Sequence, residues 1–431
     1  MTSILAMGLL WSGQSATSAT FADVWDRWKR VDAAWSLTDS KSGQILAIPH
    51  LKAAAGQIYA ARWSDACAAL DEAAAHLEGR PFGADMAVSL RFRPPVAEPG
   101  KPARLMVTWA YRPSDPSSFP LRIGNRRLVL YPNRNLTVDV LPGQLEPELA
   151  RNPELGVPVS AVVGTQNRTI VLSILKSARS RIQKLLANAD ETIRGLGEKA
   201  LAMLEAPVPA EPASSLLAIV STGEGLASGS MKLDSMRSIP YVRHRGTGLQ
   251  AAIPAIPTAV ASGRLTAVIG ISGFGGEAGF FEAFGQGSAP VEANRRGWIF
   301  IGATASENAV ENALDWLQTK LGKKIGRLFV LGFGTGAEEA LAANRLRPPT
   351  AAVALISPAN AELRRTWAEH PLYIVAGSSD AARFLNPLQA LAREMAGKST
   401  FKYDELPSCE HLTVAAQGVA GAFTFFDSLK P

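Results

Sequence analysis

The run from Arg327 to Gly336 constrains the fold more than any other part of the sequence. It reads Arg-Leu-Phe-Val-Leu-Gly-Phe-Gly-Thr-Gly, and a helical pattern follows it through Leu346. The apolar part predicts a buried strand, and the closely spaced glycines predict a sharp turn at which the backbone has no side chain to accommodate. A strand that turns at once into a helix is typical of sheets covered by helices. The run therefore predicts an α/β domain.

Further apolar strands flank this run and alternate with helical segments. The strands expected from the pattern are Leu265–Ile271, Gly297–Ile301, Ala351–Ile356, Leu372–Ala376 and Thr400–Leu406. Strands that are apolar on both faces and separated by helices indicate a mostly parallel sheet covered on each side. We place this α/β domain at residues 213–431.

The upstream part of the chain divides into three further segments. Residues 21–82 read as a helical module, because apolar residues recur at helical spacing and Gly79 follows as a stop. In residues 84–175 the apolar period changes to two and turn clusters interrupt it, which predicts a small antiparallel β-sandwich. Residues 176–212 read as a long amphipathic helix, from Lys176 to Glu205, and a proline-alanine linker.

The first twenty residues suggest a leader. Residues 1–20 contain a short apolar run, Ile4–Trp11, and then a small and polar stretch. This resembles the apolar and cleavage regions of a secretory signal, with Ala19 or Ala22 as the cleavage site, although no Lys or Arg precedes the run. We expect an exported protein, periplasmic or extracellular, with a cytoplasmic location as the alternative. No stretch has the apolar length that a transmembrane helix needs.

Composition argues against several classes of function. A net charge of +6 over 431 residues is mildly basic, and no basic run interleaved with aromatic residues accompanies it, so we expect no nucleic-acid partner. Two cysteines, Cys67 and Cys409, are too few for a zinc site, and no Cys-x-x-Cys or His-Glu-x-x-His motif occurs. We therefore expect no metal and no other cofactor. Whether the two cysteines form one long-range disulfide is open at this point.

Taken in order, the motifs of the C-terminal half resemble those of the alpha/beta hydrolase superfamily, which includes carboxylesterases, lipases and oligopeptidases. Such a protein has an oxyanion loop after its third strand, the nucleophile after its fifth, an acid after a later strand and a histidine after the last. The matching positions here are the loop 272–276, then Gly334, Asp380 and His411.

The resemblance implies a role for each matching residue. Asp380 would orient His411, and His411 would move a proton during catalysis. Glu410 and Asp404 are further carboxylates near His411 in the sequence, outside the position that the family gives its acid. Backbone N–H groups would stabilise an oxyanion or hold a ligand. The residues that would supply this binding site are Gly273, Phe274, Gly275, Gly276 and Thr335.

One position departs from the family. Gly334 stands where the serine nucleophile belongs, and without a hydroxyl no covalent acyl intermediate can form there. We therefore expect a pseudoenzyme that binds a small-molecule or peptide ligand or acts as a scaffold. The alternative is an active esterase or peptidase-type hydrolase that uses another nucleophile, such as Ser272, or water activated by His411.

The same glycines allow a second alternative. Residues Gly332–Ala337 fit the dinucleotide pattern Gly-x-Gly-x-x-Gly/Ala, and so do Gly273–Ala278. The pattern also needs an acidic residue at the end of the following strand to hold a ribose. Neither Ala354–Pro358 nor Phe300–Ala303 contains one. A dinucleotide-binding protein is therefore the weaker alternative.

Overall fold

The computed structural model describes most of the chain. The described residues are 19–98, 101–115, 117–124, 126–132, 134–140, 157–205, 213–257, 265–273, 278–285, 288–306, 308–322, 324–343, 350–359 and 370–429. The expected leader, residues 1–20, lies almost entirely outside these ranges, so export stays a prediction. Within them, no helix has the length and apolar character to cross a membrane.

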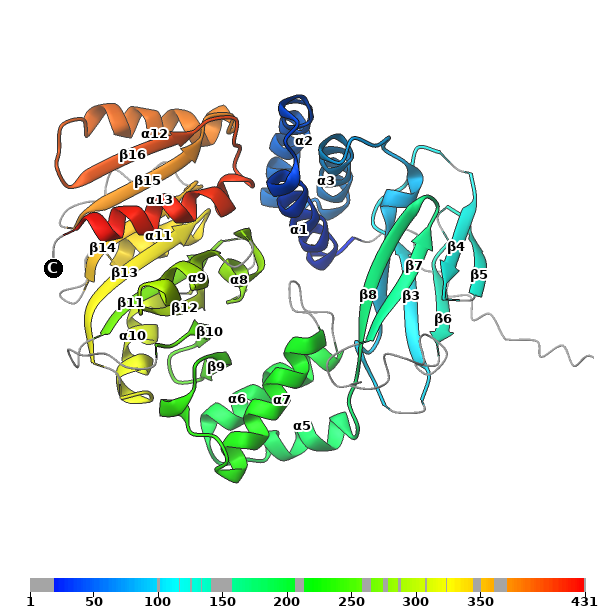
Figure 1. Cartoon of the computed structure of the whole chain (residues 1–431), viewed down its shortest axis with the longest axis horizontal. Helices are drawn as coiled ribbons and strands as arrows, with labels where there is room; N and C mark the ends of the chain where they lie inside the picture. Colours follow the sequence, from blue (N-terminus) through cyan, green and yellow to red (C-terminus); the bar gives the residue numbers. More distant parts are fainter. Residues whose placement is uncertain are drawn as a thin grey trace, which may run out of the picture.

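Three helices form the N-terminal module, α1 (Phe21–Leu37), α2 (Lys41–Tyr59) and α3 (Trp63–Leu77). Helix α1 begins at Thr20, whose backbone N–H donates to the Asp23 carboxylate at 2.8 Å. A carboxylate in the first turn is favourable because the helix N-terminus carries a partial positive charge. Figure 1 shows these helices between the C-terminal sheet and two smaller sheets.

The two smaller sheets follow along the chain. Their order is β1-β3-β6 and β2-β8-β7-β4-β5, and every pair is antiparallel except β2 with β8. The strands are β1 (Val88–Phe92), β2 (Val96–Ala97), β3 (Ala103–Trp109), β4 (Phe119–Ile123), β5 (Arg126–Leu130), β6 (Leu136–Val140), β7 (Val157–Val163) and β8 (Gln166–Ile174). Buried side chains of both sheets belong to one core. The small antiparallel β-sandwich stays a prediction.

Three helices, α5 (Ala178–Leu186), α6 (Glu191–Glu205) and α7 (Ala213–Ser228), connect the smaller sheets to the C-terminal sheet (Figure 1). The single long helix expected from Lys176 to Glu205 is therefore wrong. The helix is interrupted after α5. Asp190 precedes α6, and its side chain accepts hydrogen bonds from the N–H groups of Thr192 and Ile193 at 2.8 and 3.2 Å. An aspartate that caps backbone N–H groups favours a new helix start over continuation. The expected linker, 206–212, lies outside the described residues.

The C-terminal sheet has eight strands in the order β16-β15-β14-β13-β11-β12-β10-β9. Strands β11 to β16 run parallel, while β10 is antiparallel to both β9 and β12. The strands are β9 (Ile239–His244), β10 (Leu249–Ala255), β11 (Leu265–Ser272), β12 (Ile299–Thr304), β13 (Ile325–Phe333), β14 (Thr350–Ile356), β15 (Leu372–Gly377) and β16 (Phe401–Leu406). The predicted mostly parallel sheet in an α/β fold is confirmed.

Helices cover both faces of this sheet. The helices are α8 (Phe280–Ala283), α9 (Ser288–Arg295), α10 (Ala309–Thr319), α11 (Gly336–Ala342), α12 (Ala382–Glu394) and α13 (Val414–Ser428). Helices α10, α11 and α12 share a core with one face, and α8, α9 and α13 share a core with the other. The second face also meets α1, because the Trp28 ring lies 4.5 Å from Phe284 and 6.0 Å from Phe333. The helical module thus packs against the α/β domain.

Candidate functional site

The carboxyl ends of β11 and β13 bring two of the predicted motifs together. These strands pair directly, with Ser272 opposite Phe333. Beyond the strand end, the Gly273 N–H donates to the Phe333 carbonyl at 2.9 Å. The prediction that Gly273 offers its N–H to an oxyanion or ligand is therefore wrong, since the sheet already uses that donor. The other loop glycines, with Phe274, lie outside the described residues.

The turn at Gly334 has the expected strand-to-helix geometry. Strand β13 ends at Phe333, Gly334 has a φ of +58°, and α11 begins two residues later. The Gly334 N–H donates to Ile356 of the next strand at 3.2 Å, and its carbonyl accepts from Ala359 at 3.1 Å. Left-handed backbone suits glycine, so this residue fits the turn without strain. Thr335 follows as the N-cap residue of α11, and its N–H and hydroxyl face the Cα of Gly273.

Packing explains the glycines on either side of this turn. A Cβ on Gly332 would lie 2.8 Å from the Cα of Ala337 and 2.7 Å from the Cβ of Ala340. A Cβ on Gly336 would lie 2.5 Å from the carbonyl oxygen of Ile271. Real Cβ atoms do not approach so closely, so these glycines allow α11 to lie against the sheet. The Gly-x-Gly-x-x-Gly/Ala pattern thus has a packing cause that needs no nucleotide.

Asp380 and His411 lie together, as the resemblance implies. Asp380 follows β15 and His411 follows β16, and the two strands are neighbours in the sheet. The Nδ1 atom of His411 is 3.2 Å from Oδ2 of Asp380, and both side chains are buried. The other Asp380 oxygen accepts the N–H of Ala381 at 2.7 Å. The pair therefore has the contact that an orienting acid makes with a catalytic imidazole.

Ser357, which the sequence analysis did not single out, joins this pair. It directly follows β14, has a φ of +42°, and is completely buried. Its hydroxyl donates to Oδ2 of Asp380 at 2.8 Å and lies 2.9 Å from Nδ1 of His411. The dinucleotide pattern asks only for an acidic residue after this strand, so it gives Ser357 no role. A polar residue that directly follows a buried strand at this edge of the sheet is the signal that could have revealed it.

Tyr59, the last residue of α2, contacts the opposite side of the imidazole. Its hydroxyl lies 2.8 Å from Nε2 of His411. Burial raises the pKa of Tyr59 above its usual value, so the phenol keeps its proton and can donate a hydrogen bond to Nε2. Nδ1, on the other side of the ring, faces Ser357 and Asp380. Nε2 is the nitrogen that takes the proton of a serine nucleophile in a catalytic triad, and here a phenol from another module occupies it.

Aromatic rings enclose the imidazole. The centroid of the His411 ring is 4.6 Å from Phe384, 5.4 Å from Tyr59 and 5.7 Å from Phe333. The exposed fraction of His411 is 0%. Ser272, the alternative nucleophile, is also buried, at the end of β11. Neither side chain is exposed to solvent in this conformation.

The two other carboxylates near His411 have different surroundings. Glu410 is fully buried, and its Oε1 accepts the N–H groups of Leu412 and Thr413 at 2.9 and 2.8 Å. Burial raises the pKa of Glu410 to about 8. Asp404 is partly exposed and accepts a hydrogen bond from the Tyr373 hydroxyl at 2.9 Å. Glu410 caps the turn that carries His411, whereas Asp404 belongs to the surface of β16.

The two cysteines and the possible metal ligands can be located in the structure. Cys67 and Cys409 are both free and buried, so they do not form a disulfide. Burial raises the pKa of Cys409 to about 11, which keeps its thiol protonated. Across the described part of the chain, no three His, Cys, Asp or Glu side chains gather in a way that could hold a metal ion.

The comparisons with known proteins give structural likenesses only. No protein-family model matches the sequence, and no curated protein does. Among solved structures, S-formylglutathione hydrolase (FrmB) from Staphylococcus aureus is similar at 11% identity, with 44% of this chain and 94% of that chain covered and a TM-score of 0.35. The Pyrococcus furiosus esterase Pf2001 is similar at 10% identity, with 44% and 91% covered and a TM-score of 0.35.

A third similar structure is Est1E from Butyrivibrio proteoclasticus, at 15% identity, with 44% and 98% covered and a TM-score of 0.35. The C-terminal domain resembles the alpha/beta hydrolase superfamily in its own geometry. Its sheet is mostly parallel, its third and fifth strands pair, and a sharp glycine turn, an acid and a histidine follow the fifth, seventh and eighth strands.

Proposed function

We propose that this protein is a hydrolase-like pseudoenzyme in which the remaining histidine and carboxylate have a scaffolding role. The observation that carries the proposal is the hydrogen bond from Tyr59 to Nε2 of His411 at 2.8 Å, beside a nucleophile position occupied by Gly334. The bond joins the end of α2 to the loop after β16. The pair thus helps to attach the helical module to the α/β domain.

Three physical arguments support the absence of hydrolysis. Gly334 has no atom that could attack a carbonyl. His411 would have to release Tyr59 before it could accept a proton from water or from another nucleophile. The ring is also fully enclosed, so ligand binding at this pair would need the aromatic shell to open. Scaffolding is therefore favoured over ligand binding at this site.

An active hydrolase with another nucleophile has less support. Ser357 is close to His411, but it contacts Nδ1 and directs its proton to Asp380, so the imidazole is not its base. Ser272 is buried at the end of its strand. The dinucleotide alternative has still less, because packing accounts for Gly332 and Gly336 and the end of β14, Ala354–Pro358, contains no acid.

Hydrolysis of p-nitrophenyl acetate and butyrate by the full chain tests the proposal. We expect no turnover above the buffer rate, and the same rate for wild type and His411→Gln. A rate well above buffer that His411→Gln abolishes would contradict the proposal and favour the active hydrolase. Circular dichroism of the variant controls for folding, since this side chain is buried.

A further inference from the structure

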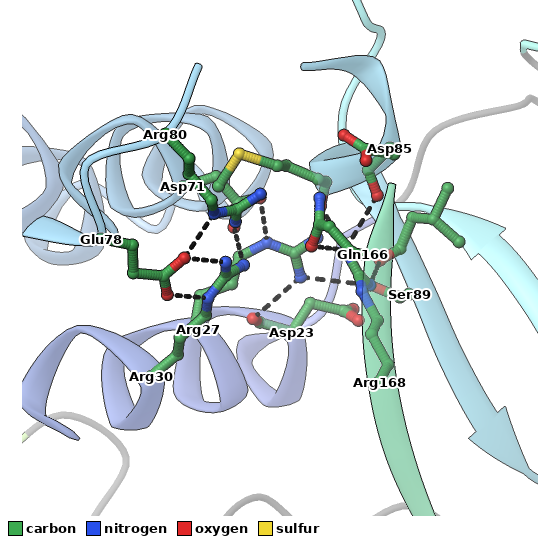
Figure 2. A network of polar contacts seen from close by, with 12 residues as sticks. Asp23, Arg27, Arg30, Asp71, Glu78, Arg80, Asp85, Ser89, Gln166 and Arg168 are labelled. Atoms are coloured by element: carbon green, nitrogen blue, oxygen red, sulfur yellow. Dashed lines mark hydrogen bonds and ion pairs between the residues drawn. The ribbon is translucent and has the colours of Figure 1, made fainter. Parts of the chain in front are cut away.

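A cavity of about 1000 Å³ lies where α1 and α3 meet β1 and β8, separate from the His411 site. Figure 2 shows the polar network of lining residues, in which Arg27 of α1 points toward residues of α3 and β8. Six of the residues that line the cavity are cationic and three are carboxylates, and two further carboxylates, Asp23 and Asp85, belong to the same network behind the lining. The cationic residues are Arg27, Lys29, Arg30, Arg80, Arg91 and Arg168.

Part of this charge is balanced inside the protein. Nε of Arg27 donates to Asp71 at 2.7 Å, and this carboxylate raises the pKa of Arg27 in spite of the opposing effect of burial. Arg30 forms two hydrogen bonds with Glu78, at 2.7 and 2.6 Å. These ion pairs join α1 to α3 and the turn after it. They account for the lining carboxylates of α3 and that turn.

The positive charge of Arg168, in β8, is not paired with a carboxylate in this way. Its guanidinium donates to the carbonyls of Val88 and Asp85, the latter at 2.8 Å, and to the side-chain oxygen of Gln166 at 3.2 Å. All these acceptors are neutral, and no carboxylate of the described residues lies within ion-pair distance of Arg168. Burial, with the nearby charge of Arg27, lowers the pKa of Arg168 to about 10. A buried cation beside other cations is stabilised by an anion.

Two buried donors on the cavity wall have no acceptor among the described residues. They are Nη2 of Arg80 and Nε2 of Gln166. Gln166 is only 8% exposed, and its oxygen is already used by Arg168. A buried N–H group without an acceptor costs about 1–3 kcal/mol. Oxygens of one anion could accept from both donors. Lys29, which also lines the cavity, forms no ion pair with any residue that the structure describes.

Apolar side chains complete the lining. They include Leu90 and Phe92 of β1, Ile170 of β8, and Leu216 of α7. Small-molecule sites combine a mostly apolar wall with a few polar groups that fix orientation, and they reach about this volume. Guanidinium groups bind carboxylate and phosphate oxygens well because both can accept paired hydrogen bonds.

We propose that this cavity binds an organic anion, with a carboxylate or phosphate head held by Arg80, Gln166 and Arg168 and an apolar body against β1 and α7. The site is independent of the hydrolase-like pair, so activity measurements do not bear on it. The helical module and the smaller sheets would then form a ligand-binding unit.

Isothermal titration of the full chain tests this site. The probes are sodium octanoate and octyl phosphate, with octanol as the uncharged control and acetate and inorganic phosphate as bare head groups. We expect saturable 1:1 binding of octanoate or octyl phosphate, at least about tenfold tighter than octanol and than the matching bare anion. The comparison of the two octyl probes identifies the head group.

Variants connect the binding to the named side chains. Arg168→Gln, and separately the double variant Lys29→Gln with Arg80→Gln, should weaken binding about tenfold or more, the effect of losing a charged hydrogen bond. Arg104→Gln is the matched control, because Arg104 is an exposed arginine of β3 outside the cavity. If Arg168→Gln does not fold, the double variant still decides, since its two side chains line the cavity and are only partly buried.

Three results would overturn the proposal. The first is no saturable binding of either octyl anion. The second is equal affinity in the cavity variants and in Arg104→Gln. The third is equal affinity for octyl phosphate and inorganic phosphate, which would remove the role of the apolar wall.

Discussion

Both ring nitrogens of His411 have partners, and these partners come from three separate elements. Tyr59 of α2 contacts Nε2, while Ser357 after β14 and Asp380 after β15 contact Nδ1. Ser357 and Asp380 are buried and Tyr59 is half-buried, and a buried polar group that loses its hydrogen-bond partner is costly. The geometry that a hydrolase uses for catalysis thus contributes to stability here.

Tyr59→Phe should lower the free energy of unfolding by about 1–2 kcal/mol, because Nε2 of a fully buried imidazole loses its donor. Guanidinium unfolding followed by circular dichroism measures the change. Tyr131→Phe is the control, since Tyr131 is an exposed tyrosine and should change stability by less than about 0.5 kcal/mol. Equal stability of Tyr59→Phe and wild type would argue that the bond contributes nothing.

Glu410 gives the fold a defined pH dependence. The pKa of Glu410 is about 8 in the folded protein, against 4.5 for an unperturbed glutamate, so the folded state holds this proton over a wider pH range. The Glu410 contribution to the free energy of unfolding is therefore fully present below pH 4.5. It falls as the pH rises to about 8, by up to about 1.4 kcal/mol per pH unit.

Glu410→Gln should remove this decline, because the amide oxygen can still accept from Leu412 and Thr413 but nothing ionises. Guanidinium unfolding at pH 5, 6, 7 and 8 compares the two proteins. The stability of the variant relative to wild type should increase with pH. Parallel curves would mean that the carboxyl titrates normally in the folded protein.

At the scale of elements, the sequence pattern predicted strands best where they are continuous apolar runs. Strands β11 to β16 were all expected. Five strands were not expected, β2, β4, β7, β9 and β10, and all of them except the two-residue β2 contain a proline. Proline removes a ladder hydrogen bond and lowers the strand signal in a sequence, although edge and irregular positions tolerate it. Strand β10 is irregular in this sense, because its pairing register shifts against both β9 and β12.

The part of the site that could be predicted consists of residues that come directly after strands of the sheet. Asp380 and His411 come after consecutive strands of the sheet, so their proximity followed from strand order. Tyr59 is 352 residues from His411 in the sequence. No local pattern reports a contact between a helix end and a loop so far along the chain. The contact between Tyr59 and His411 depends on how the helical module packs against the α/β domain, which is a property of tertiary structure.

Gly336→Ala should destabilise the protein by about 1–3 kcal/mol, because the new Cβ would press on the backbone of Ile271 and Ser272 and push α11 from the sheet. Thermal unfolding measures the effect. Gly279→Ala is the matched control, since a Cβ there meets nothing within 4 Å. A Gly336→Ala protein as stable as Gly279→Ala would mean that α11 is not held this closely.

Across the whole molecule, one buried core runs from the N-terminal helices to α13. It includes Trp25 and Trp28 of α1, Phe333 at the end of β13, and Phe426 of α13. The Phe329 and Phe426 rings stack at 4.3 Å within the same core. Modules that share a core lose stability together when one of them is weakened.

Trp28→Ala should therefore reduce hydrogen-exchange protection in β13 as well as in α1, with a stability loss of about 3–5 kcal/mol. Exchange followed by mass spectrometry resolves the two segments. Leu46→Ala, at an exposed position of α2, should leave both unchanged. Loss of protection confined to α1 would show that the helical module and the α/β domain are energetically separate.

The measurement that tests the central claim most directly is the intact mass of the full chain after incubation with a fluorophosphonate probe, beside an active serine hydrolase as positive control. With glycine at 334 and His411 in contact with Tyr59, the proposed function predicts no activated serine at this site. We expect an unchanged mass for this protein and a complete single adduct on the control. One adduct per chain, mapped to Ser272, Ser357 or any other serine, would contradict the account.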